Sequence, residues 1–452
     1  MPELVWKGKY CDGLPAAPSR ATRPIETEEI YGSRTALWHN RLILGDAADV
    51  LPGLLEDLAG KVALVYVDPP FDTGGSFDFR ATIPGSAGGV PRIVLPAYRD
   101  ARGLDAWLAW FHAAAVHLHD LLAPGGSLYV HLDAHAAHYA KVVLDEVFGA
   151  DAFQREIVWR IGWVSGFKSR TRGWIRNHDT LLFYAKGGRV RTFNKEYIPY
   201  PPGYVRRDGA PARAPGYPID DVWNGSETDR MDSIQIVSFS GEKVGYPTQK
   251  NESLVSRIVR ASSNPGDLVL DACVGSGTTA VVAAKLGRRW IACDMAPIAI
   301  HAARKRLLAL RVVAPFVVQR AGKATGSLRR KLSVRAAADA GRATLELMSF
   351  ALPARAVPAS VNAGAVHWSQ WIEGWLVDWD YRGGALASGS RLWRTLRQPR
   401  LPLSATHAYE QPGRYVALLK VFDVLGGATT REVRFDVGPS SGESPRGRLR
   451  GR

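Results

Sequence analysis

A strand, a glycine-rich turn, a helix and a second strand follow one another without interruption in residues 266–297 (GDLVLDACVGSGTTAVVAAKLGRRWIACDMAP). Gly275 and Gly277 allow the backbone to approach a ligand closely where the helix begins. Asp294, which ends the second strand, is placed to accept hydrogen bonds from ribose hydroxyls. No Gly-Lys-Ser/Thr follows the turn, which argues against a phosphate-binding loop and ATP hydrolysis. The segment therefore predicts a nucleotide-type half-site on a mostly parallel α/β sheet.

Short apolar runs alternate with helical stretches through residues 35–320, as expected for a parallel sheet covered by helices on both faces. Several runs end in Asp, at the edge where open α/β sheets bind ligands. The seven predicted strands are 41–46, 62–68, 127–133, 155–161, 180–186, 267–273 and 288–294. The predicted helices are 104–122, 134–148, 252–261, 278–286 and 297–310.

The composition divides the chain into further parts. The alternation of strands and helices stops near residue 320, and strand-like alternation with Gly-Gly turns follows later. Residues 187–245 are rich in Tyr, Pro, Gly and Arg and are too long for an ordinary loop. The predicted boundaries are an N-terminal extension at 1–34, the α/β domain at 35–320, a charged linker at 321–350, a β-sandwich at 351–438 and a disordered basic tail at 439–452.

The charge balance favours a polyanionic partner. The chain of 452 residues has 58 Lys plus Arg against 43 Asp plus Glu, a formal net charge of +15. Basic side chains placed near phosphates release condensed counterions, so nucleic acid is the favoured partner. The three cysteines have no paired spacing, and neither a signal peptide nor an apolar run of about 18 residues is evident. We expect a soluble, cytoplasmic protein without a membrane partner.

A second motif follows the strand at 62–68, where the chain continues as Asp68-Pro69-Pro70-Phe71. The exocyclic amine of adenine or cytosine is a poor nucleophile, because its lone pair is delocalised into the ring. The Asp68 carboxylate and the Pro69 carbonyl can accept the two amine hydrogens and so redirect the lone pair, and Phe71 offers a face for an extruded base. Taken alone, the tetrapeptide is equally well interpreted as a strand-to-turn signal.

Together, the two motifs resemble the amino-group DNA methyltransferases that use S-adenosylmethionine. The sequence DPPF is similar to that family's DPPY-type catalytic tetrapeptide, and DACVGSGTT is similar to its DPFCGSGTT donor motif. Residues 246–250 (YPTQK) resemble its YPTQKP segment, and the match covers roughly residues 35–312. The resemblance implies a site-specific enzyme that transfers a methyl group to double-stranded DNA.

The resemblance also implies the fold. The catalytic motif precedes the donor motif, which is the β arrangement of the family and implies a Rossmann-like, mixed seven-stranded sheet that is circularly permuted. Family members place target recognition between the two motifs, where residues 187–245 lie. In the C-terminal part, WDY at 379–381, HAYEQPGRY at 407–415 and VFDV at 421–424 resemble a PKD-type, immunoglobulin-like all-β domain, although its GDG turn is missing.

The site residues follow from the matched motifs and from the basic loops. The expected catalytic residues are Asp68, Pro69, Pro70 and Phe71. Those expected to bind the donor, S-adenosylmethionine, are Asp46, Thr248, Lys250, Asp271, Cys273, Gly275, Ser276, Gly277, Thr278 and Asp294. Those expected to contact DNA are Lys168, Arg170, Arg172, Arg206 and Arg207. No metal is expected, because His131, His135 and His138 lie in a segment that the resemblance covers.

Two departures from the family leave alternatives open. Ala272 and Cys273 replace the usual Pro and Phe, so a DNA-binding module with a decayed donor site is the rival of an enzyme. Asn251 replaces the last Pro of YPTQKP, which is expected to reduce rigidity. A tetrapeptide that opens with Asp favours N6 of adenine, with N4 of cytosine as the alternative. Carbon methylation is excluded, because no cysteine follows a Pro.

The partners beyond DNA are open at this stage. The sequence contains no helicase or nuclease motif, so a restriction or defence subunit would be a separate polypeptide. A homodimer is also open.

Overall fold

The computed structural model describes residues 3–11, 14–82, 92–161, 170, 172–226, 229, 242–323, 329–357, 367–387, 389–395 and 398–439. Residues 440–452 of the predicted disordered tail and Lys168 lie outside these ranges. No helix in the described parts is long and apolar enough to cross a membrane.

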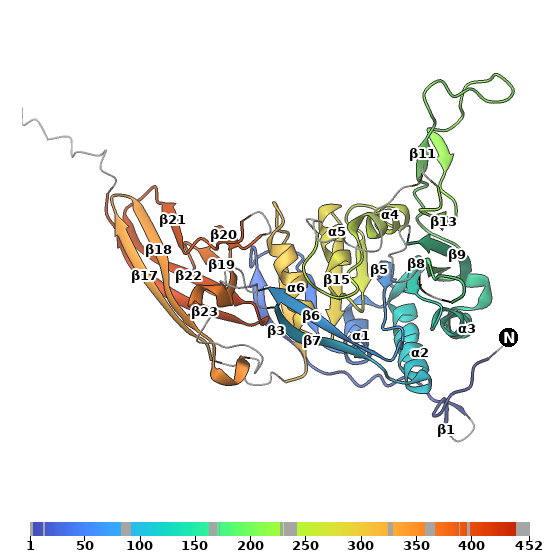
Figure 1. Cartoon of the computed structure of the whole chain (residues 1–452), viewed down its shortest axis with the longest axis horizontal. Coiled ribbons are helices and arrows are strands. Elements are labelled where there is room, and N and C mark those ends of the chain that lie inside the picture. The colour runs from blue at the N-terminus through green and yellow to red at the C-terminus, as the bar shows by residue number, and fades with distance from the viewer. Residues whose placement is uncertain are drawn as a thin grey trace, which may run out of the picture.

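A mixed sheet forms the centre of the molecule (Figure 1). All seven predicted strands belong to it, but within the described ranges it has ten strands rather than seven. From edge to edge these are β13 (Val222–Trp223), β9 (Phe153–Arg160), β10 (His178–Ala185), β8 (Leu122–Leu132), β5 (Val62–Val67), β14 (Leu268–Asp271), β15 (Arg289–Asp294), β4 (Asn40–Leu44), β16 (Phe316–Ala321) and β3 (Ile25–Tyr31). The three additional strands, β13, β16 and β3, lie at or near the edges, where burial on one face leaves a weaker apolar pattern.

Helices cover both faces of the sheet because its central strands are apolar on both sides. One face packs against α1 (Ala47–Leu58), α2 (Leu104–Leu121) and α3 (Ala137–Phe148). The other face packs against α4 (Glu252–Ser262), α5 (Thr278–Lys285) and α6 (Pro297–Leu308). The five predicted helices are present, whereas α1 was not predicted, because Pro52 lies inside it.

Parallel pairing brings the two motifs to one edge of the sheet. Strand β5 pairs in parallel with β14, and β14 pairs in parallel with β15, so the carboxyl ends of all three meet. Asp68, Asp271 and Asp294 stand at these ends. Open α/β sheets bind their ligands at this edge.

The C-terminal part folds into two antiparallel sheets around its own core. One contains β17 (Lys331–Asp339), β18 (Arg342–Ala351) and β21 (Ser404–Ala408). The other contains β20 (Ser390–Trp393), β19 (Ile372–Asp378), β22 (Gly413–Asp423) and β23 (Ala428–Val437). Strands β17 and β18 lie largely in the segment predicted to be a linker, where alanines and arginines hide the alternation.

Backbone hydrogen bonds and buried ion pairs attach this C-terminal part to the central sheet. The Leu386 N–H donates to the Ile30 carbonyl at 2.8 Å, and the Gly32 N–H donates to the Leu386 carbonyl at 3.0 Å, so the edge strand β3 is covered. Glu29 of β3 lies 2.8 Å from both Arg304 of α6 and Lys420 of β22. Strand β3 lies in the predicted N-terminal extension, so this extension joins the sheet to the C-terminal part.

Three smaller antiparallel pairs complete the described structure. They are β1 (Tyr10–Cys11) with β2 (Leu14–Pro15), β6 (Gly75–Thr82) with β7 (Arg92–Asp100), and β11 (Tyr197–Pro199) with β12 (Gly216–Pro218). The last pair forms an arm that projects from the body beyond α4 and β13 (Figure 1). The rings of Tyr200 and Tyr204 stack on this arm at a centroid distance of 4.0 Å, and Tyr217 packs edge-on against Tyr200.

Replacing Glu29 with Gln is expected to lower the free energy of unfolding by about 3 kcal/mol, because Arg304 and Lys420 then lose their shared counter-charge. Burial alone would raise the pKa of Glu29, but these two cations lower it to about 2. The stabilisation is therefore present above the ordinary value of 4.5 and is lost as the pH falls towards 2. Urea unfolding at pH 7 measures the loss.

The matched control is Glu28→Gln, since Glu28 is a partly exposed neighbour that pairs with Arg320. It is expected to change stability by less than about 1 kcal/mol. Equal losses in the two variants would contradict the argument.

Candidate active site

Hydrogen bonds fix the loop that follows β5. Trp107 of α2 donates its indole N–H to the Pro70 carbonyl at 2.6 Å. Asp72 has a positive φ of 56°, and its backbone N–H donates to Asp100 at 2.7 Å. Pro69 and Pro70 restrict the backbone after Asp68, and the two hydrogen bonds hold it on both sides of Phe71, so Asp68 and Phe71 have little freedom to change position.

The two oxygens of the Asp68 carboxylate differ in their partners. Lys250 Nζ contacts Oδ2, and this pairing joins residues 182 positions apart in the sequence. Oδ1 is buried and has no hydrogen-bond partner among the described residues. A buried carboxylate oxygen without a partner is costly, which points to a donor that arrives with a ligand.

Phe71 lies between a cation and a buried histidine. Lys250 Nζ is 5.4 Å from the centroid of the Phe71 ring. On another side, the rings of Phe71 and His131 lie 6.5 Å apart with an interplanar angle of 27°. The ring is therefore held in one orientation beside the free oxygen of Asp68.

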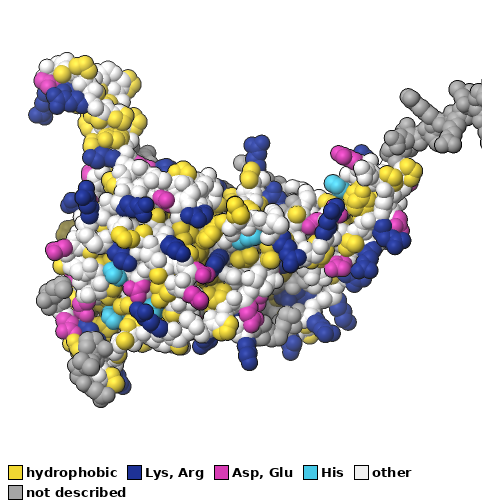
Figure 2. Space-filling model, turned by 180° about the vertical axis from the view of Figure 1, so that it is seen from behind, with side chains coloured by type: hydrophobic (Ala, Val, Ile, Leu, Met, Phe, Trp, Pro, Cys, Tyr) yellow, Lys and Arg dark blue, Asp and Glu magenta, His cyan; other side chains and the backbone are white. Residues whose placement is uncertain are grey.

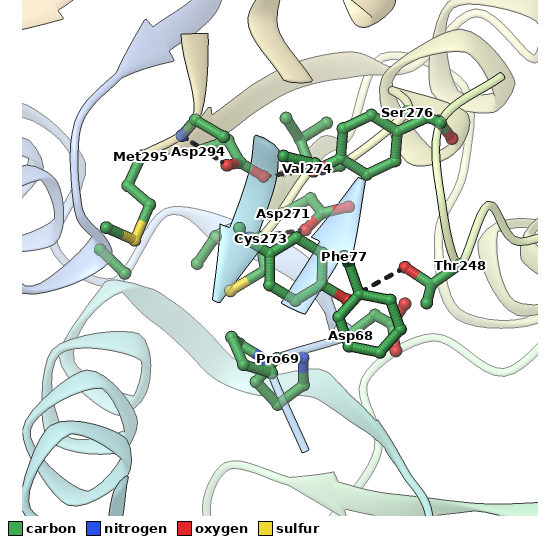
Figure 3. Close-up of a pocket in the computed structure, with 18 of the residues that line it drawn as sticks. Asp68, Pro69, Phe77, Thr248, Asp271, Cys273, Val274, Ser276, Asp294 and Met295 are labelled. Atoms are coloured by element: carbon green, nitrogen blue, oxygen red, sulfur yellow. Dashed lines mark hydrogen bonds between the residues drawn. The ribbon is translucent and has the colours of Figure 1, made fainter. Parts of the chain in front are cut away.

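A cavity of about 520 Å³ opens at these strand ends (Figure 3). It is lined by all four predicted catalytic residues and by nine of the ten predicted donor residues. These nine are Asp46, Thr248, Lys250, Asp271, Cys273, Gly275, Ser276, Thr278 and Asp294. The tenth, Gly277, is the N-cap of α5, and a Cβ there would lie 2.6 Å from the Cα and Cβ of Ala303. Helix packing, rather than cavity lining, therefore requires this glycine.

The acids at the ends of β14 and β15 are buried beside the glycine turn. Asp294 accepts hydrogen bonds from the N–H groups of Gly275 and Ala296, both at 2.9 Å. Burial raises the pKa of Asp294 to about 6. Burial also raises the pKa of Asp271 to about 7, against the opposing hydrogen bonds from Thr279 and the Cys273 N–H. A ligand with hydroxyl or cationic groups would satisfy these carboxylates.

Asp46 has structural partners of its own. It is the N-cap of α1 and accepts from the Ala48 N–H at 3.0 Å. It also accepts from the Trp110 indole N–H at 2.9 Å and lies 3.3 Å from Arg102. The Arg102 guanidinium stacks over the Trp110 ring at 5.0 Å, so this corner of the cavity has one flat, polar wall.

Several lining residues were not predicted as part of the site. Phe77 of β6 and Tyr98 of β7 stack with centroids 4.9 Å apart, and the Tyr98 hydroxyl lies 3.2 Å from Thr248 Oγ1 (Figure 3). Arg102, Trp110 and Met295 also line the cavity. No motif marks Phe77, Tyr98 or Arg102. The only signal for them in the sequence is the unusual length of the segment 72–103 in which they lie.

Of the residues predicted to contact DNA, the four that the structure describes lie outside the cavity. Arg206 and Arg207 are on the loop at the end of the β11–β12 arm, where Figure 2 shows Lys and Arg side chains. Arg206 pairs with Asp208 at 2.7 Å. Arg170 and Arg172 belong to the segment between β9 and β10 and are exposed.

Comparison with known proteins gives the family. A profile of the DNA methylase family matches residues 62–305, which include the catalytic tetrapeptide and the glycine turn. The chain belongs to the DNA methylase family. The type II methyltransferase M.HpaI of Haemophilus parainfluenzae is 28% identical over 267 residues, which are 59% of this chain and 74% of that protein.

Two further similarities accompany this match to the DNA methylases. The DNA adenine methyltransferase YhdJ of Escherichia coli K12 is 26% identical over 263 residues, covering 55% of this chain and 76% of that protein. Among solved structures, the complex of M1.HpyAVI with SAM has a TM-score of 0.39 at 21% identity and covers 60% of this chain and 99% of that one.

The structure shows the surroundings of Cys273 and Asn251, two residues that differ from the family motifs. The Cys273 side chain lines the cavity, and burial raises the pKa of its thiol, so it is uncharged. Asn251 caps α4, because its side chain accepts from the Leu254 N–H at 2.9 Å. The cap contributes about 1 kcal/mol. The expected loss of rigidity from replacing Pro is therefore offset locally.

Binding of S-adenosylmethionine, the donor that the motifs imply, is expected to weaken about tenfold between pH 7 and pH 5. The reason is that a donor hydroxyl needs an ionised Asp294, and one unit below a pKa of about 6 only about a tenth of the carboxylate is ionised. Calorimetric titration across this range measures the change. The Asp294→Asn variant is the control, since the step near pH 6 is expected to disappear in it. A step that persists in this variant would assign the titration to another group.

Proposed function

We propose that this DNA methylase transfers the methyl group of S-adenosylmethionine to the N6 amine of adenine in double-stranded DNA. The observation that carries the proposal is the buried Oδ1 of Asp68, which has no hydrogen-bond partner in the described parts of the chain and which, like Phe71, belongs to the wall of the cavity. This oxygen lacks a hydrogen-bond donor, and an exocyclic amine can supply one. The cavity continues from Asp68 to the glycine turn, so both reactants have room on one side of the sheet.

Asp68 and the backbone after it perform the positioning. With a target base against Phe71, Oδ1 of Asp68 and the Pro69 carbonyl would each accept one amine hydrogen, which turns the nitrogen lone pair towards the donor. The donor supplies a methyl group on a cationic sulfur. Lys250 holds Oδ2 of Asp68, so the carboxylate presents its other oxygen to the base. As the N–CH3 bond forms, the S–CH3 bond of the donor breaks, and the proton that the methylated amine must lose would pass to Oδ1 of Asp68. Beyond this, the protein supplies orientation and the exclusion of water.

The donor is proposed to lie between the glycine turn and the acids of β14 and β15. Asp294 is placed to accept from hydroxyl groups, and Asp46, Arg102 and Trp110 form a wall suited to a flat ring. Thr248 and Lys250 stand at the other end of the cavity, where the methionine part of the donor is proposed to lie.

Adenine is favoured over cytosine on two grounds. The tetrapeptide opens with Asp, as in the adenine enzymes that the sequence resembles, and the relative from Escherichia coli is named an adenine methyltransferase. The amine chemistry is the same for both bases, so N4 of cytosine is the second candidate.

We also propose that the sheet is circularly permuted in the family's β arrangement, that the C-terminal part is a PKD-like sandwich, and that the arm with Arg206 and Arg207 takes part in target recognition. Restriction activity is proposed to reside on a separate polypeptide.

Purified protein incubated with labelled S-adenosylmethionine and unmethylated genomic DNA, followed by nucleoside mass spectrometry, tests the reaction. We expect N6-methyladenine, reduced at least about 10²-fold by Asp68→Ala. Asp57→Asn, an exposed carboxylate on α1, is the matched control and should methylate as the wild type does. N4-methylcytosine would move the proposal to the second base. DNA binding without any methylation would favour the decayed binding module.

Replacing Phe71 with Ala is expected to reduce methylation by about tenfold or more, because stacking of one base on an aromatic ring contributes about 1–3 kcal/mol. Replacing it with Tyr keeps the ring and should preserve most of the rate. Single-turnover methylation separates this loss from product release. Equal rates for the Ala and Tyr variants would show that the ring does not hold the base.

A further inference from the structure

The segment between β9 and β10 lies at the active edge of the sheet. Strand β9 is antiparallel to β10, β10 is antiparallel to β8, and β8 is parallel to β5. The end of β9 and the start of β10 therefore lie at the edge where Asp68 follows β5. The described part of this connection is residue 170 and residues 172–177.

Trp174 in this segment is fully exposed, with a relative accessibility of 101%. A tryptophan is usually largely buried, since its ring has a large apolar area. Trp174 is absent from the lining of the cavity, so it does not serve the bound donor or the base inside. The ring is therefore available to a ligand that binds at this edge of the sheet.

The charges beside Trp174 point to the chemistry of that partner. Residues 170–177 contain Arg170, Arg172 and Arg176 and no Asp or Glu. Arg170 and Arg172 are exposed. Guanidinium groups beside an exposed aromatic ring are suited to nucleic acid, because they contact phosphates while the ring stacks on bases.

A chain of contacts that begins at the exposed Arg176 connects this segment to Phe71 in the loop after β5. Arg176 pairs with Asp179 and lies 3.7 Å from Asp133. Asp179 lies 3.2 Å from Nε2 of His131, which is fully buried and packs against Phe71. Trp174 is two residues from Arg176, so its Cα is within about 7 Å of the Arg176 Cα. The backbone that carries the exposed ring is thus anchored through Arg176 to the residues around Phe71.

We propose that Trp174 inserts into the DNA duplex and fills the space that the flipped target base leaves, while Arg170 and Arg172 contact the flanking phosphates. This inference rests on the proposed function. Extrusion of a base removes its stacking on both neighbours, and an inserted apolar or aromatic side chain replaces part of that stacking. Phe71 then stacks on the flipped base inside the site, and Trp174 fills the space that the base leaves in the duplex.

In the first step of the test, wild-type protein methylates unmethylated plasmid DNA and the methylated positions are mapped. A failure at this step refutes the proposed function and not the role of Trp174. Duplexes with the mapped site are then made with 2-aminopurine at the target position, whose fluorescence rises when the base leaves the stack. We expect Trp174→Ala to bind these duplexes about 10-fold or more weakly and to show a smaller fluorescence rise, with Trp174→Phe closer to wild type.

The salt dependence of binding separates the ring from the arginines. Trp174→Ala should leave the slope of log K against log salt unchanged, whereas Arg172→Gln should reduce it by about one unit. The matched control is Leu37→Ala, because Leu37 is equally exposed, at 106%. It precedes β4 and so lies at the amino ends of the parallel strands, opposite the carboxyl ends that Asp68 follows. It should behave as wild type.

Thermal unfolding of the Trp174 variants should match that of wild type, since an exposed ring contributes little to the core. Wild-type affinity and wild-type fluorescence in Trp174→Ala would overturn the proposal. A change in self-association alone, seen by light scattering, would also overturn it, because it would assign the ring to a protein contact.

Discussion

The parallel pairing of β5 with β14 is the interaction on which the site depends. These strands come from distant parts of the chain, and their register aligns Val65 with Leu270. The alignment brings the proline-rich catalytic loop and the glycine turn to one edge, where Lys250 can reach Asp68. Without this pairing, each motif would be an ordinary turn at the end of a strand.

The electrostatics of the cavity follow from this convergence. Five carboxylates, those of Asp46, Asp68, Asp100, Asp271 and Asp294, line one cavity. Their burial and mutual repulsion raise the pKa values of Asp271 and Asp294 to about 7 and 6. A site with this excess of acid favours a cationic ligand such as a sulfonium, and its preference decreases once the methyl group and its charge have left. The repulsion among these carboxylates thus suits the proposed donor and its release.

Thirteen of the residues that line the cavity were predicted from the sequence, because a tetrapeptide and a glycine turn each require particular residues at fixed spacing. The seven inner strands were also predictable, since burial on both faces leaves continuous apolar runs. The edge strand β3 and helix α1 were not predicted, because β3 is charged for its ion pairs and α1 contains Pro52. Phe77, Tyr98 and Arg102 line the cavity through tertiary pairing of β6 with β7, which leaves no local pattern in the sequence. Gly277 was predicted as a donor residue from the glycine turn, but its lack of a side chain is required by the close packing of Ala303 of α6.

Oδ1 of Asp68 is proposed to be the acceptor for the target amine. A crystal structure of the protein with a DNA duplex that contains the target base and with a non-reactive donor analogue tests it most directly. We expect an extruded adenine stacked on Phe71, with its N6 about 2.7–3.2 Å from Oδ1 of Asp68 while Lys250 remains in contact with Oδ2. An extruded base with its amine on other groups, or an Asp68 that binds only the donor, would contradict it.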